Sequence, residues 1–353
     1  MTDQLLVWRQ GRLGRMRLNR PAALNALTPE MLIAFDAALD AFVADEEILA
    51  VYVDGAGDRG FCAGGDIRTL YEKRDSAPDY YKHFWRIEYP LNARIGAFPK
   101  PYIVLMDGLV MGASIGVSAH GSHRLVTPRT RFAMPETQIG FLPDAGGTWL
   151  LGRRGAAGAY LALTGATIGA GDLLHLGLAD YCVDPATLTD LERRLSQARN
   201  VADINAILAD AHTSPPQATL IAQESLISRA FDQESVAAIL AALQAHDGVF
   251  AAAAAAHILR ASPTSLKLTR RLLALAGAAA SLEEALTHEY RAACRLLAGH
   301  DLYEGIRAAI IERDKNPRWS PASLDEVDDA AIEDMLRGTG DPNPVFRPAH
   351  SVG

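Results

Sequence analysis

The sequence contains few cysteines. Cys62, Cys182 and Cys294 are the only three among 353 residues, and they are widely spaced and odd in number. A disulfide framework needs paired cysteines, and a zinc knuckle needs closely spaced ligands. The sequence therefore predicts neither a disulfide-stabilised domain nor a metal centre built on cysteine.

The chain also lacks an excess of positive charge and a long apolar run. Its 34 basic and 42 acidic residues give a formal charge of -8, so we expect no nucleic acid partner. The longest apolar stretches, such as Val249 to Ala256, are far shorter than the roughly 20 residues of a membrane-spanning helix. Residues 1–8 do not follow the charged, apolar and cleavage-site order of a signal peptide. We expect a cytoplasmic protein with no membrane partner.

The apolar content is sufficient for a large buried core. Apolar residues make up 49% of the chain, and the mean hydropathy is +0.03. These values exclude disordered and fibrous classes, and the length fits one large domain with a substantial appendage.

Strand and helix signals alternate in the first half of the chain. Thr28-Pro29-Glu30 supplies an N-cap, a first-turn proline and a favourable acid for a helix to about residue 44. This arrangement predicts an α/β core of stacked ββα-type units. The other expected elements are strands at 5–8, 13–18, 50–54, 102–106 and 124–126, and helical segments at 66–73 and 112–119.

The second half has a different composition. Alanine-rich helical stretches, including 251–256, are broken at 214–216 and 262–263 by prolines. We therefore divide the chain into a core over residues 1–196 and a helical C-terminal region over 197–353.

Two glycine-containing turns each follow a predicted strand and open a helix. They are Phe61 to Ile67, with Gly64-Gly65, and Met111 to Ser114. One such turn alone is best explained as an ordinary strand-to-helix turn. Two turns together favour converging backbone amides that stabilise a developing oxyanion, where losing one donor typically costs roughly 3 to 4 kcal/mol. The glycine-lysine-serine or -threonine ending of a phosphate-binding loop is absent.

Three short motifs in the first 190 residues carry a family resemblance. They are Asn19-Arg20-Pro21 with Leu24-Asn25-Ala26-Leu27, the turn from Cys62 to Asp66, and Pro135-Glu136 with Gly146-Gly147-Thr148. In these motifs the chain resembles the enoyl-CoA hydratase/isomerase (crotonase) superfamily. The resemblance implies a crotonase-like core, an acyl-CoA substrate as the partner, and no metal or redox cofactor. It leaves the oligomeric state open, with a homo-oligomer as one option.

Further motifs, several of them beyond that core, make the resemblance more specific. They are Phe132 to Thr137, Pro143-Asp144, Ser262 to Lys267, Gly299-His300-Asp301 with Glu304 to Ala308, and Asp314 to Trp319. They are similar to the superfamily's 3-hydroxyisobutyryl-CoA hydrolase group, which acts in valine breakdown. This likeness implies hydrolysis of a short-chain β-hydroxyacyl-CoA thioester to the free acid and CoA.

The resemblance assigns roles to individual positions. Glu136 falls on the catalytic glutamate and Asp144 on a second acid of the hydrolase group, while Gly65 and Ala113 fall on the two oxyanion amides. Glu88, ahead of Tyr89, matches a substrate-contacting glutamate. The further residues expected at the substrate are Leu24, Ala63, Gly64, Asp66 and Gly112.

Two departures from the family pattern affect these assignments. Ala113 replaces a usual glycine, which is tolerable if its φ is negative, because only its amide is needed. Ala22 or Ala23 stands where many relatives carry a lysine, so contact with the coenzyme's phosphates is expected from Arg59. Asp66 has a structural interpretation as well, as the N-cap of the helix that follows it.

Alternative functions remain open at this point. Gly116 takes the place of one of the two glutamates that hydratases of the superfamily use, which favours hydrolysis over hydration. An enoyl-CoA isomerase or hydratase would keep the same oxyanion amides. A non-catalytic acyl-CoA-binding protein is the alternative outside enzymology, although intact Glu136 and Asp144 speak against it.

Overall fold

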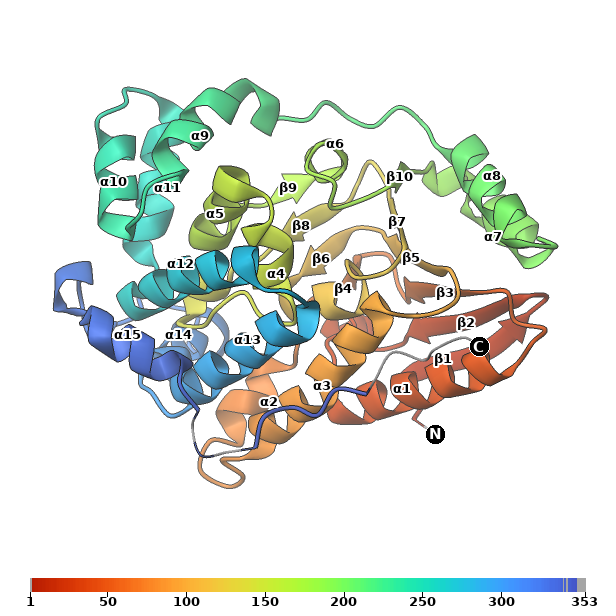
Figure 1. Cartoon of the computed structure of the whole chain (residues 1–353), viewed down its shortest axis with the longest axis horizontal. Helices are drawn as coiled ribbons and strands as arrows, with labels where there is room; N and C mark the ends of the chain where they lie inside the picture. The colour runs from red at the N-terminus through yellow and green to blue at the C-terminus, as the bar shows by residue number, and fades with distance from the viewer. Residues whose placement is uncertain (1, 339, 341, 348–353) are drawn as a thin grey trace.

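Two β-sheets form the centre of the computed structural model, which describes residues 2–338, 340 and 342–347. The larger sheet has the strand order β1-β2-β3-β5-β7-β10, and the smaller one β4-β6-β8-β9 (Figure 1). The larger sheet comprises β1 (Leu5–Gln10), β2 (Leu13–Leu18), β3 (Ala50–Gly55), β5 (Tyr102–Met106), β7 (His123–Val126) and β10 (Tyr181–Cys182). The smaller comprises β4 (Gly60–Cys62), β6 (Leu109–Met111), β8 (Arg131–Ala133) and β9 (Ile168–Gly169).

The chain visits the two sheets in turn. β3, β5 and β7 are parallel neighbours in the larger sheet, and the strands that follow them, β4, β6 and β8, are parallel neighbours in the smaller one. A helix or 3₁₀ helix follows each of these strand pairs. This alternation confirms the predicted α/β class with stacked ββα units. It also places the helix-opening turns after β4, β6 and β8 beside one another.

The helices after the first strands follow their sequence signals closely. The Thr28 side chain caps α1 by accepting a hydrogen bond from the Met31 amide at 3.3 Å, and Asp66 caps α2 through the Thr69 amide at 3.3 Å. The α-helices of the first part are α1 (Pro29–Ala44), α2 (Ile67–Glu72), α3 (Tyr80–Gly96), α4 (Gly147–Gly152), α5 (Gly155–Thr164), α6 (Ala170–His175) and α7 (Leu188–Ser196).

Two elements differ from the sequence-based expectation. The segment expected as a helix over 112–119 is a 3₁₀ helix over Gly112–Val117. The 17-residue α3 was not predicted, because Pro90 lies inside it and proline normally ends a helix. The apolar spacing of α3 is nevertheless helical. Its buried residues are Tyr81, Phe84, Trp85, Glu88, Tyr89, Leu91, Asn92, Ala93 and Ile95.

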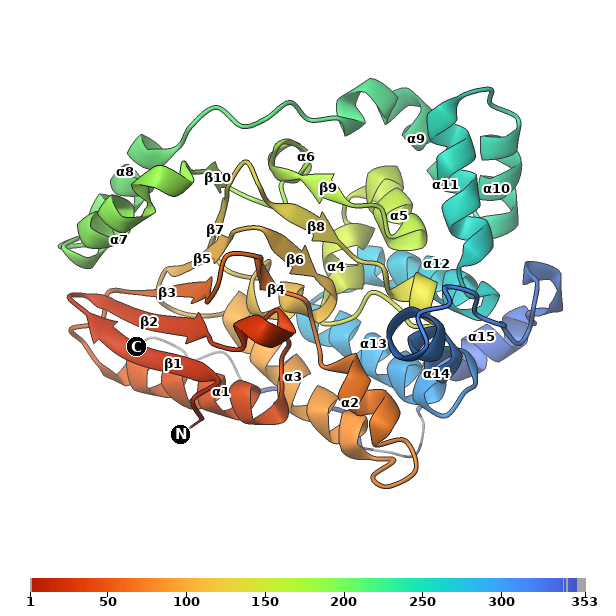
Figure 2. The ribbon, with the colours of Figure 1, turned by 180° about the vertical axis from the view of Figure 1, so that it is seen from behind.

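The C-terminal half is helical, as predicted. Figures 1 and 2 show α9 to α15 along one side of the sheets, with α12 and α13 next to α4, and α8 beside α7 at the opposite end. They are α8 (Val201–Ala211), α9 (Glu224–Phe231), α10 (Val236–Gln244), α11 (Val249–Arg260), α12 (Pro263–Ala278), α13 (Leu282–Leu297), α14 (Asp301–Ile306) and α15 (Asp329–Leu336). Short 3₁₀ helices lie at Pro21–Ala23, Glu136–Ile139, Pro185–Thr187, Leu220–Gln223 and Leu324–Glu326, with a π-helical turn at Arg307–Ile311.

One buried cluster joins the two halves. Phe35 of α1, Trp85 of α3, Leu273 of α12 and Leu286 of α13 all belong to it. A second, smaller cluster lies between the larger sheet and α7 and α8. The division at residues 196 and 197 stays a prediction, although the change from strands to helices falls near it.

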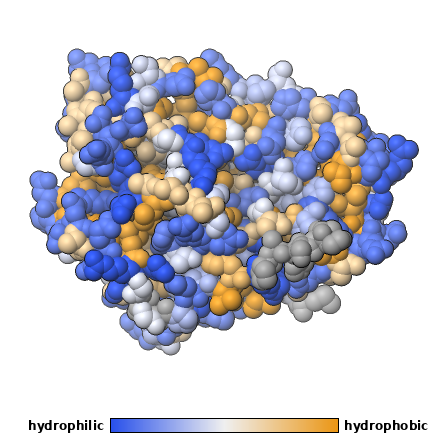
Figure 3. Space-filling model, in the orientation of Figure 1, coloured by the Kyte–Doolittle hydropathy of each residue, from blue (hydrophilic) through white to orange (hydrophobic). Residues whose placement is uncertain are grey.

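The described residues contain no helix that is both long enough and apolar enough to cross a membrane. Figure 3 shows hydrophilic residues spread over the face in view, with apolar patches between them.

Candidate active site

The two glycine turns lie against each other. Gly64 has a φ of +96°, and a Cβ added there would lie 2.9 Å from the Met111 carbonyl oxygen and 3.2 Å from the Ala113 nitrogen. Only glycine accommodates this combination of positive φ and close backbone approach. The fold thus brings together two turns that are separated by nearly fifty residues in the sequence.

The first turn is held by backbone hydrogen bonds to the segment before α1. The Ala63 amide donates to the Leu24 carbonyl at 2.9 Å, and the Asp66 amide donates to the Leu27 carbonyl at 3.2 Å. Between them, the Gly65 amide has no acceptor within the described part of the chain. It is therefore available to a ligand.

The second turn offers a matching amide. Ala113 is the second residue of its 3₁₀ helix, and N–H groups in a helix's first turn have no acceptor inside the helix. The positive φ in this turn belongs to Gly112, at +56°, and not to Ala113. Alanine can therefore replace the family's usual glycine at position 113, because the φ of Ala113 is not positive.

Both turns open into one cavity of about 570 Å³. Ten of the eleven residues predicted for the site line it, and Arg59 does not. The ten are Leu24, Ala63, Gly64, Gly65, Asp66, Glu88, Gly112, Ala113, Glu136 and Asp144.

The arginines that line the cavity are Arg20 and Arg68, and the predicted Arg59 is not among them. The Arg59 guanidinium donates to the carbonyl oxygens of Pro21 and Ala22, so it fixes the 3₁₀ turn in front of Leu24. Arg20 lines the cavity and pairs with Asp66 at 3.1 Å. Arg68 also lines it and donates to the Ile310 carbonyl at 3.2 Å. Sequence reasoning missed both, although Arg20 belongs to a quoted motif.

Three carboxyl groups line this cavity. Glu136 opens the 3₁₀ helix after β8, Asp144 lies in the loop that follows, and Glu88 comes from α3. The Tyr89 hydroxyl donates to Asp144 Oδ2 at 2.9 Å. Both oxygens of Glu88 and the Oε2 atom of Glu136 are buried without a hydrogen-bond partner among the described residues.

The spacing of Glu136 and Asp144 results from a folded loop. Gly140 ends the 3₁₀ helix with a φ of +71°, and the Phe141 amide donates back to the Glu136 carbonyl at 2.9 Å. A Cβ at Gly140 would lie 2.3 Å from the Asp301 carbonyl oxygen, so α14 packs directly against this bend. The loop returns both acids to the same cavity.

Burial controls the protonation of these acids. Loss of water raises the pKa of Glu88 and of Glu136 well above the ordinary range, and the nearby Asp144 charge raises both further. Burial raises the pKa of Asp144 to about 7, although the Tyr89 hydrogen bond opposes it. A carboxyl group that titrates near neutral pH can both take up and release a proton.

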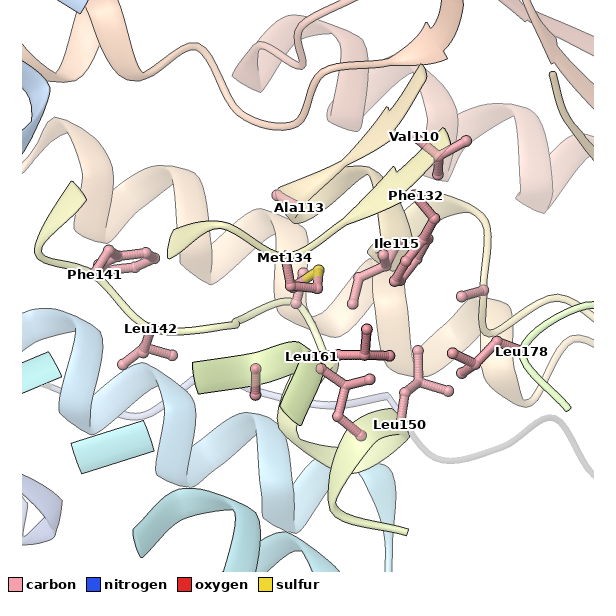
Figure 4. Close-up of a cluster of buried hydrophobic side chains, with 14 of the residues drawn as sticks. Val110, Ala113, Ile115, Phe132, Met134, Phe141, Leu142, Leu150, Leu161 and Leu178 are labelled. Carbon is pink, nitrogen blue, oxygen red and sulfur yellow. The ribbon is translucent and has the colours of Figure 1, made fainter. Parts of the chain in front are cut away.

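The cavity wall is largely aromatic and aliphatic. Tyr81, Phe84 and Trp85 of α3 line it, and Trp85 stacks on Phe141 with ring centroids 5.5 Å apart. Figure 4 shows Phe141 and Ala113 in the same buried cluster as the side chains beneath them. These wall residues were not predicted. The helical spacing from Tyr81 to Glu88 was the signal that could have identified them.

The position of the absent hydratase glutamate is closed. A Cβ added to Gly116 would lie 2.4 Å from Asn92 Nδ2, and Asn92 is fully buried on α3. A side chain at 116 would require Asn92 to move. A glutamate at this position would therefore have to displace the buried Asn92 side chain.

Replacing Gly112 should disturb the second turn and the adjacent acid together. A Cβ at Gly112 would lie 2.7 Å from Glu136 Oε1, in addition to the strain of its positive φ. We expect Gly112→Ala to lower kcat for acyl-CoA turnover by about 100-fold, as displaced catalytic groups typically do. Gly169→Ala is the matched control, because its Cβ would meet nothing closer than 3.8 Å. Equal kcat values for both variants would contradict the geometry.

The buried acids also predict an unusual pH dependence of stability. The folded pKa of Asp144 is about 7, above its ordinary value of 3.8, so unfolding releases a proton between these two values. The free energy of unfolding should therefore fall as the pH rises towards 7. In Asp144→Asn, the loss of stability between pH 5 and pH 8 should be smaller by roughly 1 to 3 kcal/mol. Urea unfolding at both pH values measures this.

The exposed Glu46→Gln is the control for this measurement, and its stability should change with pH as in the unmodified protein. An identical pH dependence in Asp144→Asn would show that the Asp144 carboxyl is not held protonated by burial.

Comparison with known proteins agrees with this architecture. A family model described as enoyl-CoA hydratase/isomerase matches residues 13–336. The chain is 38% identical to the mitochondrial 3-hydroxyisobutyryl-CoA hydrolase of Gallus gallus, over 95% of this chain and 89% of that one. It is 36% identical to the Homo sapiens protein of that name, over 98% and 91%.

Two solved structures share nearly the whole fold. A carnitinyl-CoA dehydratase from Mycobacterium thermoresistibile is 41% identical with a TM-score of 0.92, covering 98% of this chain and 100% of that one. An enoyl-CoA hydratase from Rhodobacter sphaeroides 2.4.1 is 39% identical with a TM-score of 0.90 and the same coverage. With the family model matching most of its length, the chain belongs to the enoyl-CoA hydratase/isomerase family.

Proposed function

We propose that the protein hydrolyses a short-chain β-hydroxyacyl-CoA thioester of the 3-hydroxyisobutyryl-CoA type to the free acid and coenzyme A. The observation that carries the proposal is one cavity that combines two available amides with three buried carboxyl groups, while Asn92 packs against Gly116, where hydratases of the superfamily carry an acid. Relatives that are 36% to 38% identical over nearly the full chain bear the name of this hydrolase.

The two turns support the first step. A thioester carbonyl oxygen between the amides of Gly65 and Ala113 would receive two hydrogen bonds as negative charge develops on it. Glu136, beside Gly112, would either take a proton from the attacking water or attack the carbonyl carbon itself. In the second case water opens the resulting anhydride. Both routes add one water, break the C–S bond and release the CoA thiol.

The other two acids support the preference for a hydroxylated substrate. The Glu88 oxygens lie at the cavity without a protein partner, so they can accept a hydrogen bond from a β-hydroxyl group. Asp144, held by Tyr89, titrates near neutral pH and can give a proton to the leaving thiolate. The reaction uses these groups and water, so it requires neither a metal nor a redox cofactor.

A second candidate reaction is the addition or removal of water, and a specific observation favours it. The two solved structures similar to this chain are named as a dehydratase and a hydratase. Asn92, packed against Gly116, argues against the two-glutamate form of that reaction.

The expected location in the cytoplasm stays a prediction, and relatives such as those from Gallus gallus and Homo sapiens are named as mitochondrial. A homo-oligomer and the absence of nucleic acid or membrane partners are likewise proposals.

An acyl-CoA panel tests the reaction directly. We expect thiol release to be fastest with 3-hydroxyisobutyryl-CoA or 3-hydroxypropionyl-CoA. Isobutyryl-CoA, which lacks the hydroxyl group, should react at least about tenfold more slowly because Glu88 would then stay unpaired. Glu88→Gln should reduce this difference. Enoyl-CoA hydration or isomerisation that is much faster than any thiol release would refute the proposal.

The two catalytic acids should be separable by substitution. Glu136→Gln should lower kcat by about 100-fold or more while acyl-CoA still binds, because the amide can neither accept a proton nor attack a carbonyl. Asp144→Asn should lower kcat less than Glu136→Gln does if Asp144 only orients groups. It should lower kcat as much if Asp144 transfers the proton. The double variant distinguishes these cases, since residues that act in one step lose no more together than singly. Near-normal kcat in Glu136→Gln would exclude the mechanism.

A further inference from the structure

The backbone directly after Asp144 is strained. Ala145 has a φ of +53° and Gly146 a φ of +82°, so two consecutive residues adopt the left-handed conformation. A non-glycine residue in this region typically costs about 1 to 3 kcal/mol and persists only where its surroundings hold it. The turn carries a catalytic acid on its first residue, so whatever holds the turn also fixes that acid.

Glu289, from α13 in the C-terminal half, holds the turn by binding two of its backbone amides. Its Oε2 atom accepts from the Gly146 amide at 2.8 Å, and its Oε1 atom accepts from the Thr148 amide at 3.0 Å. The Thr148 hydroxyl donates to the same Oε1 atom. The Glu289 side chain is fully buried, and this contact spans more than 140 residues of sequence. A buried carboxyl with three donors is oriented far more strictly than an apolar side chain would be.

His120 closes the turn from the opposite side. Its Nε2 atom is 2.9 Å from the Ala145 carbonyl oxygen. A Cβ at Gly146 would lie 2.3 Å from the same imidazole nitrogen, so the ring leaves no space for the turn to shift. The peptide group between Ala145 and Gly146 is therefore fixed at both ends, its N–H by Glu289 of α13 and its carbonyl by His120, which lies in the turn before β7.

We propose that Glu289 is a positioning residue for Asp144: by binding the amides of Gly146 and Thr148, it holds the strained turn that aims the Asp144 carboxyl into the acyl-CoA cavity. This inference rests on the proposed role of Asp144 and extends it to a residue that does not line the cavity. A purely structural Glu289 would join α13 to the core and affect stability alone.

Thr148 provides the least disruptive test. Thr148→Val keeps the shape but removes the hydroxyl that donates to Glu289, whereas Thr148→Ser keeps the hydroxyl. We expect Thr148→Val to lower kcat about tenfold with little change in KM, and Thr148→Ser to retain most of the activity. Thermal unfolding verifies that both are folded at the assay temperature. The same kcat in both variants would overturn the proposal.

A double-variant cycle tests whether Glu289 acts through Asp144. Glu289→Gln should lower kcat by about 10- to 100-fold in the unmodified protein and by less than about twofold in an Asp144→Asn background. Glu284→Gln, an exposed acid on the same helix, is the matched control and should leave kcat unchanged. Equal losses in both backgrounds would show that Glu289 does not work through Asp144.

These tests do not require the catalysed reaction to be hydrolysis. The kcat ratios are taken for whichever acyl-CoA reaction the unmodified protein catalyses, so a failure of hydrolysis alone leaves them valid. Hydrogen exchange supplies a measurement without turnover: in Thr148→Val or Glu289→Gln, exchange should accelerate in peptides over 142–150 and stay unchanged over 61–67. Unchanged exchange over 142–150 would overturn the proposal even if no turnover is found.

Discussion

The burial of several carboxyl groups in one apolar cavity is the constraint on which the rest of the site depends. An isolated carboxylate is costly to remove from water, so each buried acid must be protonated, receive hydrogen bonds or meet a ligand. Hydrogen bonds serve Asp144 in the cavity and Glu289 behind it, whereas burial raises the pKa of Glu88 and Glu136 and so favours their protonated form. Asp144 receives the Tyr89 hydroxyl, Glu289 receives two backbone amides and the Thr148 hydroxyl, and the Glu88 oxygens face the ligand cavity. Of the acids at the cavity, Asp144 has a pKa of about 7, so it can exchange a proton near neutral pH.

The C-terminal helices complete a site whose amides come from the core. The 3₁₀ helix that begins at Glu136 is fixed by the Ser262 amide, which donates to the Thr137 carbonyl at 3.1 Å, and by the Gln138 side chain, which donates to the His257 carbonyl at 3.0 Å. Glu289 from α13 holds the turn after Asp144. The two available amides thus come from turns of the core, whereas the placement of both acids also depends on helices that follow residue 197.

Local signals in the sequence predicted most of the fold, and distant contacts account for what was missed. The cap at Thr28 and the two glycine turns are determined within a few residues, so their structures follow from residue type. The helix around Pro90 was missed because its stability comes from burial of one face, which outweighs the local cost of proline. Glu289 could not have been identified, since its partners lie more than 140 residues away. Arg59 was assigned to the coenzyme's phosphates because Ala22 or Ala23 replaces the lysine of many relatives, and its contacts with the Pro21 and Ala22 carbonyl oxygens are not visible in the sequence.

The backbone does not by itself determine the reaction. Structures named as a dehydratase and a hydratase are similar to this chain with TM-scores of 0.92 and 0.90, so one fold is compatible with more than one reaction name. What such amides stabilise is negative charge on the carbonyl oxygen, which forms both when the α-carbon loses a proton and when a nucleophile adds to the carbonyl carbon. Which reaction takes place therefore depends on where the acids lie relative to the α-carbon and the carbonyl carbon. Here Asn92 closes the position at Gly116, and a rigid turn presents Asp144 instead.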